Sequence, residues 1–361
     1  MPITQRLPRS ASLLFLVALL VVPVPSSGDD DPIHEALSAV VHIRAEIPPT
    51  ARTARLLGTQ REASGIVIDA EGLILTVGYI VLEAAHVAVT SLDGRSVEAT
   101  LIGNDYDTGF GLLRTAQPLP VSPIPLGLSA ELAEQTEVLV ASYGALEAVR
   151  PALVTARREF TGYWEYLLED AIFTAPPHPN WAGAALIGPG GHLLGIGSLF
   201  VGDALQGRPS ERRLPGNMFI PIDRLKPILP ALLATGRTPK PPRPWLGLFT
   251  EEIGGHLFIS GTIPEGPSAQ AGLRPGDIIV GVGDRTVSGR AEFYRAVWAQ
   301  GEAGVEIPLQ ILRESAIQTL PVRSLDRDQY FQTEPAPQQR QNPEARSAQV
   351  RPQPWARPQT G

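Results

Sequence analysis

The chain has 361 residues, of which 43% are hydrophobic, so it is long enough for two or three domains with proper cores. Its formal net charge is −7 at pH 7, which disfavours nucleic acids and anionic membranes as partners. There is no Cys, so the fold needs no disulfides and offers no cysteine for a lipid anchor.

The N-terminus predicts a secretory signal peptide over residues 1–28. Arg6 and Arg9 precede an apolar stretch, Ala11–Val22, that is too short to span a bilayer comfortably. Small residues follow up to Gly28, where cleavage is expected, and the loss of two Arg changes the formal charge to −9. We therefore expect a periplasmic or secreted bacterial protein with no membrane span after signal removal.

The next part of the chain predicts many short strands. Ser64–Thr76 reads as a buried hairpin, because two apolar runs enclose a turn closed by glycine. A second hairpin is predicted over Val87–Ile102, with Asp93 and Gly94 at its turn. Further apolar runs occur at residues 111–113, 138–142, 184–187 and 193–201. Short strands with frequent turns indicate an all-β barrel or sandwich.

Taken together, these segments resemble the high-temperature-requirement (HtrA/Deg) family of trypsin-fold serine proteases. Five landmarks of that family come in the same order here: Ala63–Ile66, Leu75–Val81, Asp93–Arg95, Thr108–Leu113 and Asn180–Leu186. The resemblance implies a mainly β fold, with a trypsin-like double β-barrel over residues 29–235.

The resemblance also implies that the catalytic triad is degenerate. The positions that match the family's His, Asp and Ser hold Tyr79, Gly109 and Ala182. A protonated phenol is no general base at neutral pH, glycine orients nothing, and alanine has no nucleophile. Asn180 replaces the glycine that lends an N–H to the oxyanion hole, and Trp181 follows it. We expect the rings of Tyr79 and Trp181 to fill the vestigial cleft.

Six other residues have side chains that could take part in catalysis: His86, His178, Asp105, Asp107, Thr174 and Ser198. His86 is predicted at the exposed start of a strand, and His178 either lines the cleft or is a plain loop residue. Turn formation accounts for Asp105 and Asp107. The six His show no ligand spacing, so we predict neither a metal nor a cofactor.

A second resemblance begins after a proline-rich linker predicted over residues 236–242. Residues 243–325 resemble a bacterial PDZ domain of the HtrA type, an α+β fold. Pro244–Leu248 matches the segment that binds a peptide carboxylate, and Ile263–Ile279 matches the PDZ core signature. A helix is predicted over Ala291–Trp298 and a strand over Val305–Leu312, where Pro308 suggests an edge position.

The PDZ resemblance implies binding by β-augmentation, in which a peptide adds a strand to a sheet edge and its carboxylate meets backbone amides. The implied peptide-binding residues are Trp245, Leu246, Gly247, Leu248 and Phe293. Trp245, Leu246 and Leu248 also fit a plain core role. Residues 326–361 are rich in Pro, Gln and Arg and are expected to be disordered.

These observations favour a secreted HtrA-like pseudoprotease that binds unfolded or C-terminal peptide segments as an adaptor, sensor or holdase. An active serine-type endopeptidase with a displaced nucleophile is one alternative, because the fold is most often catalytic. A regulatory subunit of an active homologous protease is another. The resembling family often forms trimers, so a homo-oligomer is also possible.

Overall fold

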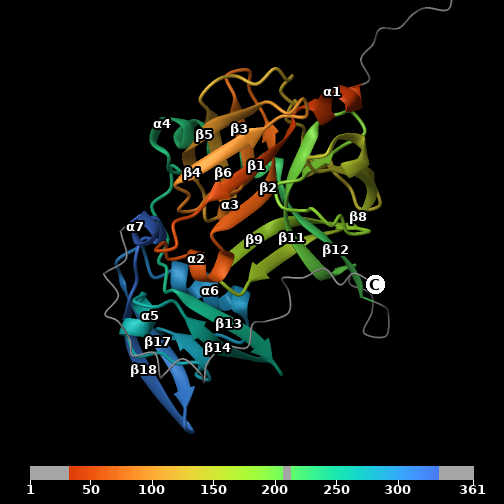
Figure 1. Cartoon of the computed structure of the whole chain (residues 1–361). Helices are drawn as coiled ribbons and strands as arrows, with labels where there is room; N and C mark the ends of the chain where they lie inside the picture. The colour runs from red at the N-terminus through yellow and green to blue at the C-terminus, as the bar shows by residue number, and fades with distance from the viewer. Residues whose placement is uncertain (1–31, 206–212, 333–361) are drawn as a thin grey trace, which may run out of the picture.

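The computed structural model describes residues 32–205 and 213–332. The predicted signal peptide, residues 1–28, lies outside this part of the chain. Two closed β-barrels are followed by a smaller sheet that carries its own helices (Figure 1). This arrangement confirms the predicted mainly β architecture and its order along the chain.

The first barrel has the strand order β1-β2-β3-β6-β5-β4. Its strands are β1 (Val40–Glu46), β2 (Gln60–Val67), β3 (Leu73–Val77), β4 (His86–Thr90), β5 (Ser96–Asn104) and β6 (Phe110–Thr115). Its helices are α1 (Pro32–Ser38), α2 (Ala54–Leu57) and α3 (Gly78–Val81). Both predicted hairpins form, with Gly94 at a φ of 86° in the turn between β4 and β5.

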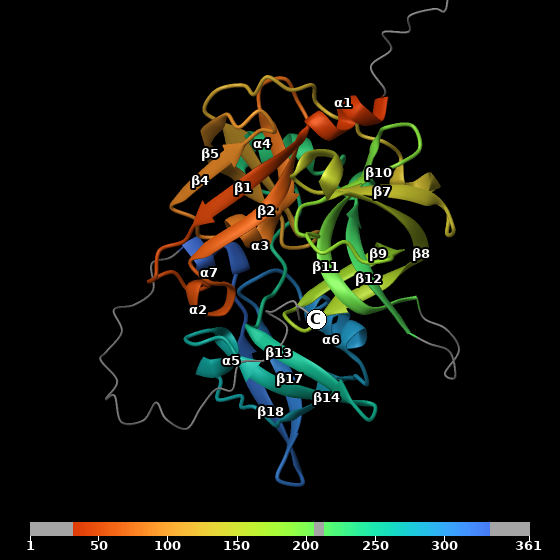
Figure 2. The same cartoon turned by 45° about the vertical axis from the view of Figure 1, so that its right-hand side comes forward.

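The second barrel has the strand order β10-β11-β12-β9-β8-β7. Its strands are β7 (Glu137–Ala141), β8 (Val149–Gly162), β9 (Tyr166–Ala175), β10 (Ala185–Ile187), β11 (Leu193–Leu205) and β12 (Leu214–Pro221). Short helices are η1 (Ser129–Glu131), η2 (Ala145–Ala148), η3 (Ile222–Arg224) and α4 (Leu229–Thr235). The β8–β9 hairpin is long, and in both cartoon views its turn points away from the barrels (Figure 2).

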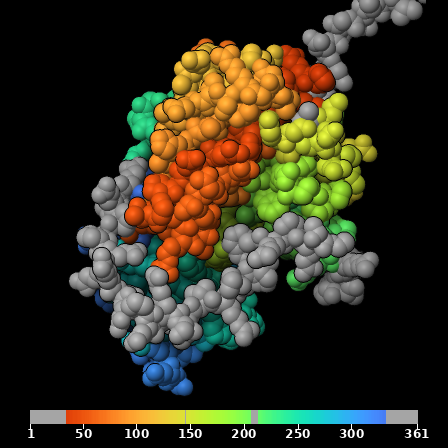
Figure 3. Space-filling view, in the orientation of Figure 1, coloured from red at the N-terminus to blue at the C-terminus, as the bar shows by residue number. Residues whose placement is uncertain are grey.

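One apolar cluster extends across both barrels. Phe110 and Leu112 of the first barrel and Phe173 and Ile220 of the second are fully buried in the same cluster. The space-filling view shows the first barrel, in red and orange, directly beside the second, in yellow and green (Figure 3). Because apolar burial holds the barrels together, segments that lie between them are held in place from both sides.

The third unit is a sheet of the order β13-β14-β15-β17-β18, with β16 paired to β15. Its strands are β13 (Leu248–Ile253), β14 (His256–Thr262), β15 (Ile278–Val282), β16 (Arg285–Thr286), β17 (Glu306–Arg313) and β18 (Ala316–Arg323). Its helices are α5 (Pro267–Gln270) and α6 (Arg290–Trp298), the second of which confirms the predicted helix. Strand β13 is an edge of this sheet.

The edge position suggested by Pro308 is wrong, because β17 lies between β15 and β18. The carbonyl of Pro308 accepts the Gly283 N–H at 2.8 Å, in the turn beyond the end of the β15–β17 ladder. The missing N–H therefore faces a turn and breaks no strand pairing.

Part of the segment predicted to be a disordered tail is a helix, α7 (Arg327–Gln332). The ring of Tyr330 lies 4.8 Å from that of Trp245, and the ring of Phe331 lies 5.9 Å from it, between centroids. These aromatic contacts supply the apolar burial that composition alone did not reveal. Residues 333–361 lie outside the described part. No helix within the described ranges is long and apolar enough to cross a membrane.

Candidate functional site

The three triad-equivalent positions lie on segments between the two barrels, and we call them the triad-equivalent site. Tyr79 is in α3, directly after β3. Gly109 precedes β6, and Ala182 lies in the loop before β10. Each position follows from the order of the strands, so the framework expected from the resemblance is present.

Tyr79 is hydrogen-bonded rather than poised for proton transfer. Its hydroxyl donates to the carbonyl of Ser198 in β11 at 2.9 Å, and its backbone carbonyl accepts from Arg61 Nη1 at 2.8 Å. Burial raises the pKa of the Tyr79 phenol well above its ordinary value, against a lowering contribution from a hydrogen bond with Trp181. The phenol therefore stays protonated across the physiological range.

Gly109 sits in a backbone conformation that side chains rarely adopt, with a φ of 90°. A Cβ built there lies 3.3 Å from Ile220 Cδ1 and 3.5 Å from the hydroxyl oxygen of Tyr166. That hydroxyl donates to the carbonyl of Thr108 at 2.6 Å. The place of the expected carboxylate is thus bordered by a tyrosine already engaged in a hydrogen bond.

The loop around Ala182 is held tightly to its surroundings. The Ala182 carbonyl accepts from Ser64 N at 2.9 Å, and Gly183 N donates to the carbonyl of Gly197 at 2.8 Å. A Cβ on Gly183 would lie 1.9 Å from the Ser64 carbonyl oxygen, at a φ of 71°. The framework of a nucleophile loop is therefore retained around a residue that carries no nucleophile.

The amide of Asn180, which the resemblance places in the oxyanion hole, bonds to a side chain of its own loop. Asn180 N donates to Nδ1 of His178 at 3.1 Å, and Nε2 of His178 lies 3.0 Å from the carbonyl of Ala148. Since Nδ1 accepts, the ring is neutral and its Nε2–H donates. Burial lowers the pKa of His178, so the neutral form is favoured. His178 is a buried structural residue of its loop, with 2% of its surface exposed.

The other candidate residues do not assemble into a replacement triad. His86 is exposed at the start of β4, as predicted. The Asp105 carboxylate accepts from the backbone of Asp107 and from Thr108, which is the predicted turn role. Thr174 is buried in β9, and the carbonyl of Ser198 accepts the Tyr79 hydroxyl. Within residues 32–205 and 213–332, no three His, Cys, Asp or Glu come together as a group that could hold a metal ion.

The segment matched to the PDZ carboxylate loop precedes β13, and we call it the carboxylate loop (residues 245–248). Gly247 has a φ of 71°, which lets successive amides turn toward one point. The carbonyl of Leu246 accepts from both the backbone and the hydroxyl of Ser268, at 2.9 and 2.7 Å. The loop is therefore fixed from behind by α5.

The predicted peptide-binding side chains lie in two places. Leu246, Leu248 and Phe293 share one apolar cluster and are at most 1% exposed. Trp245 instead packs its ring against α7, as described above. Of the predicted set, the structure brings the three apolar residues and Gly247 together, and it directs Trp245 to the helix at the end of the described chain.

One residue at this loop escaped the sequence analysis. Glu165, in the turn between β8 and β9, accepts from Leu246 N and Leu248 N, each at 2.9 Å. Burial raises the pKa of its carboxyl, while these amides and Arg327 act in the opposite direction. An acidic residue in a hairpin turn carries no local signal of such a contact, because turns commonly hold polar residues.

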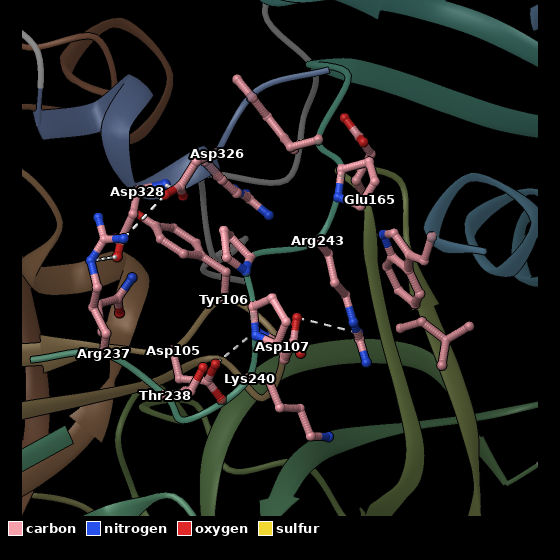
Figure 4. Close-up of a pocket in the computed structure, with 18 residues that line it drawn as sticks. Asp105, Tyr106, Asp107, Glu165, Arg237, Thr238, Lys240, Arg243, Asp326 and Asp328 are labelled. Atoms are coloured by element: carbon pink, nitrogen blue, oxygen red, sulfur yellow. Dashed lines mark hydrogen bonds and ion pairs between the residues drawn. The ribbon is translucent and has the colours of Figure 1, made fainter. Parts of the chain in front are cut away.

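A cavity of about 120 Å³ lies beside this contact, between the first barrel, the linker, α6 and the start of α7. Glu165 and Leu167 line it from the second barrel, and Asp107 pairs with Arg243 across it at 3.2 Å (Figure 4). A second cavity, near α7, is lined by residues such as Leu82 and Phe331. None of the triad-equivalent residues lines either of these two cavities.

Comparison with known proteins matches both parts of the chain. The trypsin-like peptidase domain family matches residues 63–196, and the PDZ domain family matches residues 244–323. Protease Do-like 1, chloroplastic, of Arabidopsis thaliana is 28% identical over 278 residues, or 70% of this chain and 61% of its own length. Serine endoprotease DegS of Escherichia coli is 27% identical over 278 residues, or 72% of this chain and 75% of its own length.

A relative from Salmonella typhimurium, named periplasmic serine endoprotease DegP, is 25% identical over 270 residues, or 70% of this chain and 54% of its own length. The solved structure of the HtrA-type protease AlgW with a decapeptide matches 82% of this chain and 98% of that chain, with 21% identity and a TM-score of 0.50. At 21% sequence identity, the likeness to the AlgW structure shows a shared fold and nothing further. The chain is therefore HtrA/Deg-like, with a trypsin-like serine protease fold followed by a C-terminal PDZ domain.

Proposed function

We propose that this chain is a periplasmic or secreted pseudoprotease, which binds polypeptide segments through its PDZ domain and acts as an adaptor, sensor or holdase. The observation that carries the proposal is the content of the triad-equivalent site. Tyr79, Gly109 and Ala182 supply no general base, no orienting carboxylate and no nucleophile. The Tyr79 hydroxyl is moreover engaged with the Ser198 carbonyl.

The binding half of the proposal rests on the carboxylate loop. The amides of Leu246 and Leu248 converge on one carboxylate, and the apolar side chains of Leu246, Leu248 and Phe293 lie beside it. That combination of donors and apolar surface suits the C-terminus of a protein that ends in a hydrophobic residue. The AlgW structure with a decapeptide and the relatives named periplasmic support peptide binding in that compartment.

Three measurements on the purified protein test the proposal. Casein incubated with the protein from a protease-deficient host should remain intact, and a fluorophosphonate should label no residue. Calorimetry should detect short peptides with free hydrophobic C-termini and not the same peptides with amidated ends. Casein cleavage that follows the protein through purification would instead favour an endopeptidase with a displaced nucleophile. Equal binding of free and amidated peptides would contradict carboxylate recognition.

A further inference from the structure

The carboxylate loop already holds a carboxylate of this chain. Glu165 Oε2 accepts from Leu246 N and its Oε1 accepts from Leu248 N, each at 2.9 Å. Glu165 lies 81 residues before Leu246, on the turn of the β8–β9 hairpin. The hairpin therefore presents to the loop the same chemical group as the end of a peptide.

The backbone of the hairpin continues this likeness along β13. The carbonyl of Tyr163 accepts from Thr250 N at 3.0 Å. Amides two residues apart on a strand point to the same side, so Leu248 and Thr250 offer their N–H groups to one edge. Strand β13 uses its other edge to pair with β14. The hairpin turn thus occupies the start of the edge that an added peptide strand would use.

Apolar and polar contacts complete the fit. Leu167 is 7% exposed and belongs to the cluster formed by Leu246, Leu248 and Phe293. The Tyr294 hydroxyl in α6 donates to the carbonyl of Gly162 at 2.7 Å and accepts from Glu165 N at 3.1 Å. The turn is therefore held by the sheet edge, the loop and the helix of the PDZ domain together.

The local backbone gives no reason for a glutamate at this position. Glu165 has a φ of 59°, in the left-handed region, and is only 7% exposed. Such a conformation is strained for a residue with a side chain, and a carboxylate is rarely buried without partners. The contacts with the carboxylate loop account for the burial, and they compensate the cost of the turn.

We propose that residues 162–167 are an internal ligand of the carboxylate loop, and that a protein C-terminus binds there only after this hairpin turn has left. This inference rests on the proposed peptide-binding function and adds its regulation. Peptide and hairpin compete for the same amides, those of Leu246 and Leu248, so the full-length chain binds peptides more weakly than its PDZ domain permits.

The test compares the full-length protein with Glu165→Gln and Glu165→Ala. Glutamine keeps the shape, but its NH₂ group opposes loop amides that can only donate. Glu169→Gln is the matched control, because Glu169 lies on β9 of the same hairpin and pairs with Arg224 of η3, away from the PDZ domain. The probes are a library of short peptides with free hydrophobic C-termini and the same library amidated.

We expect both Glu165 variants to bind the free-carboxylate peptides at least about tenfold more tightly than the natural chain, equivalent to about 1.4 kcal/mol. Hydrogen exchange at the amides of Leu246, Leu248 and Thr250 should become faster in the same variants. The control should change neither quantity. Thermal unfolding followed by circular dichroism establishes that each variant is folded.

Two results would overturn the inference: unchanged exchange at these amides, or faster exchange with peptide affinity equal to that of the natural chain. The second result leaves the proposed function intact. If exchange becomes faster and neither the natural chain nor the variants bind peptide, the hairpin is still the ligand of the loop. In that case the proposed peptide-binding function is the one that fails.

Discussion

The triad-equivalent site and the carboxylate loop are both occupied by side chains of this chain, but they differ in what has been altered. At the triad-equivalent site the residue types themselves lack the chemistry, so no movement of Tyr79 would create a nucleophile. At the carboxylate loop every amide donor is present, and a single carboxylate, that of Glu165, engages them.

A site can lose its function in two ways: its reactive groups can be replaced, or an internal group can occupy it. The loss of reactive groups is permanent. The backbone around the site can still stabilise the fold, as the hydrogen bonds around Gly183 indicate. Occupation by an internal group is reversible, because the same donors become available once the contact opens. In our proposal, binding therefore remains adjustable while serine-type catalysis does not. The following predictions test this contrast, from the largest expected effect to the smallest.

Gly183→Ala should lower the free energy of unfolding by roughly 3 kcal/mol or more. The new Cβ would lie 1.9 Å from the Ser64 carbonyl oxygen at a positive φ, so both overpacking and backbone strain act. Gly202→Ala is the control, since a Cβ there meets nothing within 4 Å. Urea unfolding of both variants measures the effect. Equal stability would mean that the loop at the triad-equivalent site is not part of the rigid framework.

Leu167→Ala should lower the free energy of unfolding by about 2 kcal/mol, because it removes a buried side chain from the PDZ cluster. Leu153→Ala, in the partner strand β8 and 40% exposed, should cost much less. Thermal unfolding compares the two variants. A negligible effect at Leu167 would show that the hairpin does not pack firmly against the PDZ domain in solution, and that the loop is open.

His178 should make the protein less stable as the pH falls below about 6.5, the ordinary value for histidine. Its pKa is lowered in the folded state by burial, so the unfolded chain binds the proton more readily and acid favours unfolding. His178→Gln should reduce this pH dependence. The same pH slope of the free energy of unfolding in both proteins would refute the prediction.

Restoring the triad with Tyr79→His, Gly109→Asp and Ala182→Ser should produce no cleavage of casein and no fluorophosphonate labelling. An aspartate at position 109 would need the φ of 90° and would approach the Tyr166 hydroxyl. The Asn180 amide would still be bonded to His178. Activity in the restored variant would mean that this site differs from an active protease only in three side chains.

The sequence by itself determined the features that depend on residues close together in the chain. Turn residues and apolar runs predicted two hairpins of the first barrel, and the PDZ signature predicted the carboxylate loop. The identity of Tyr79, Gly109 and Ala182 needed only the order of landmarks. Each of these inferences depends on residues close together in the chain, where periodicity and turn chemistry act directly.

Only the tertiary structure decided which distant groups meet. Tyr79 and Ser198 are 119 residues apart, Glu165 and Leu246 are 81 apart, and α7 folds because Trp245 offers it an aromatic surface. A pattern of residue types does not predict such pairs, because they form only when separately folded units pack against one another. The contact that closes the carboxylate loop is therefore visible only in the assembled chain.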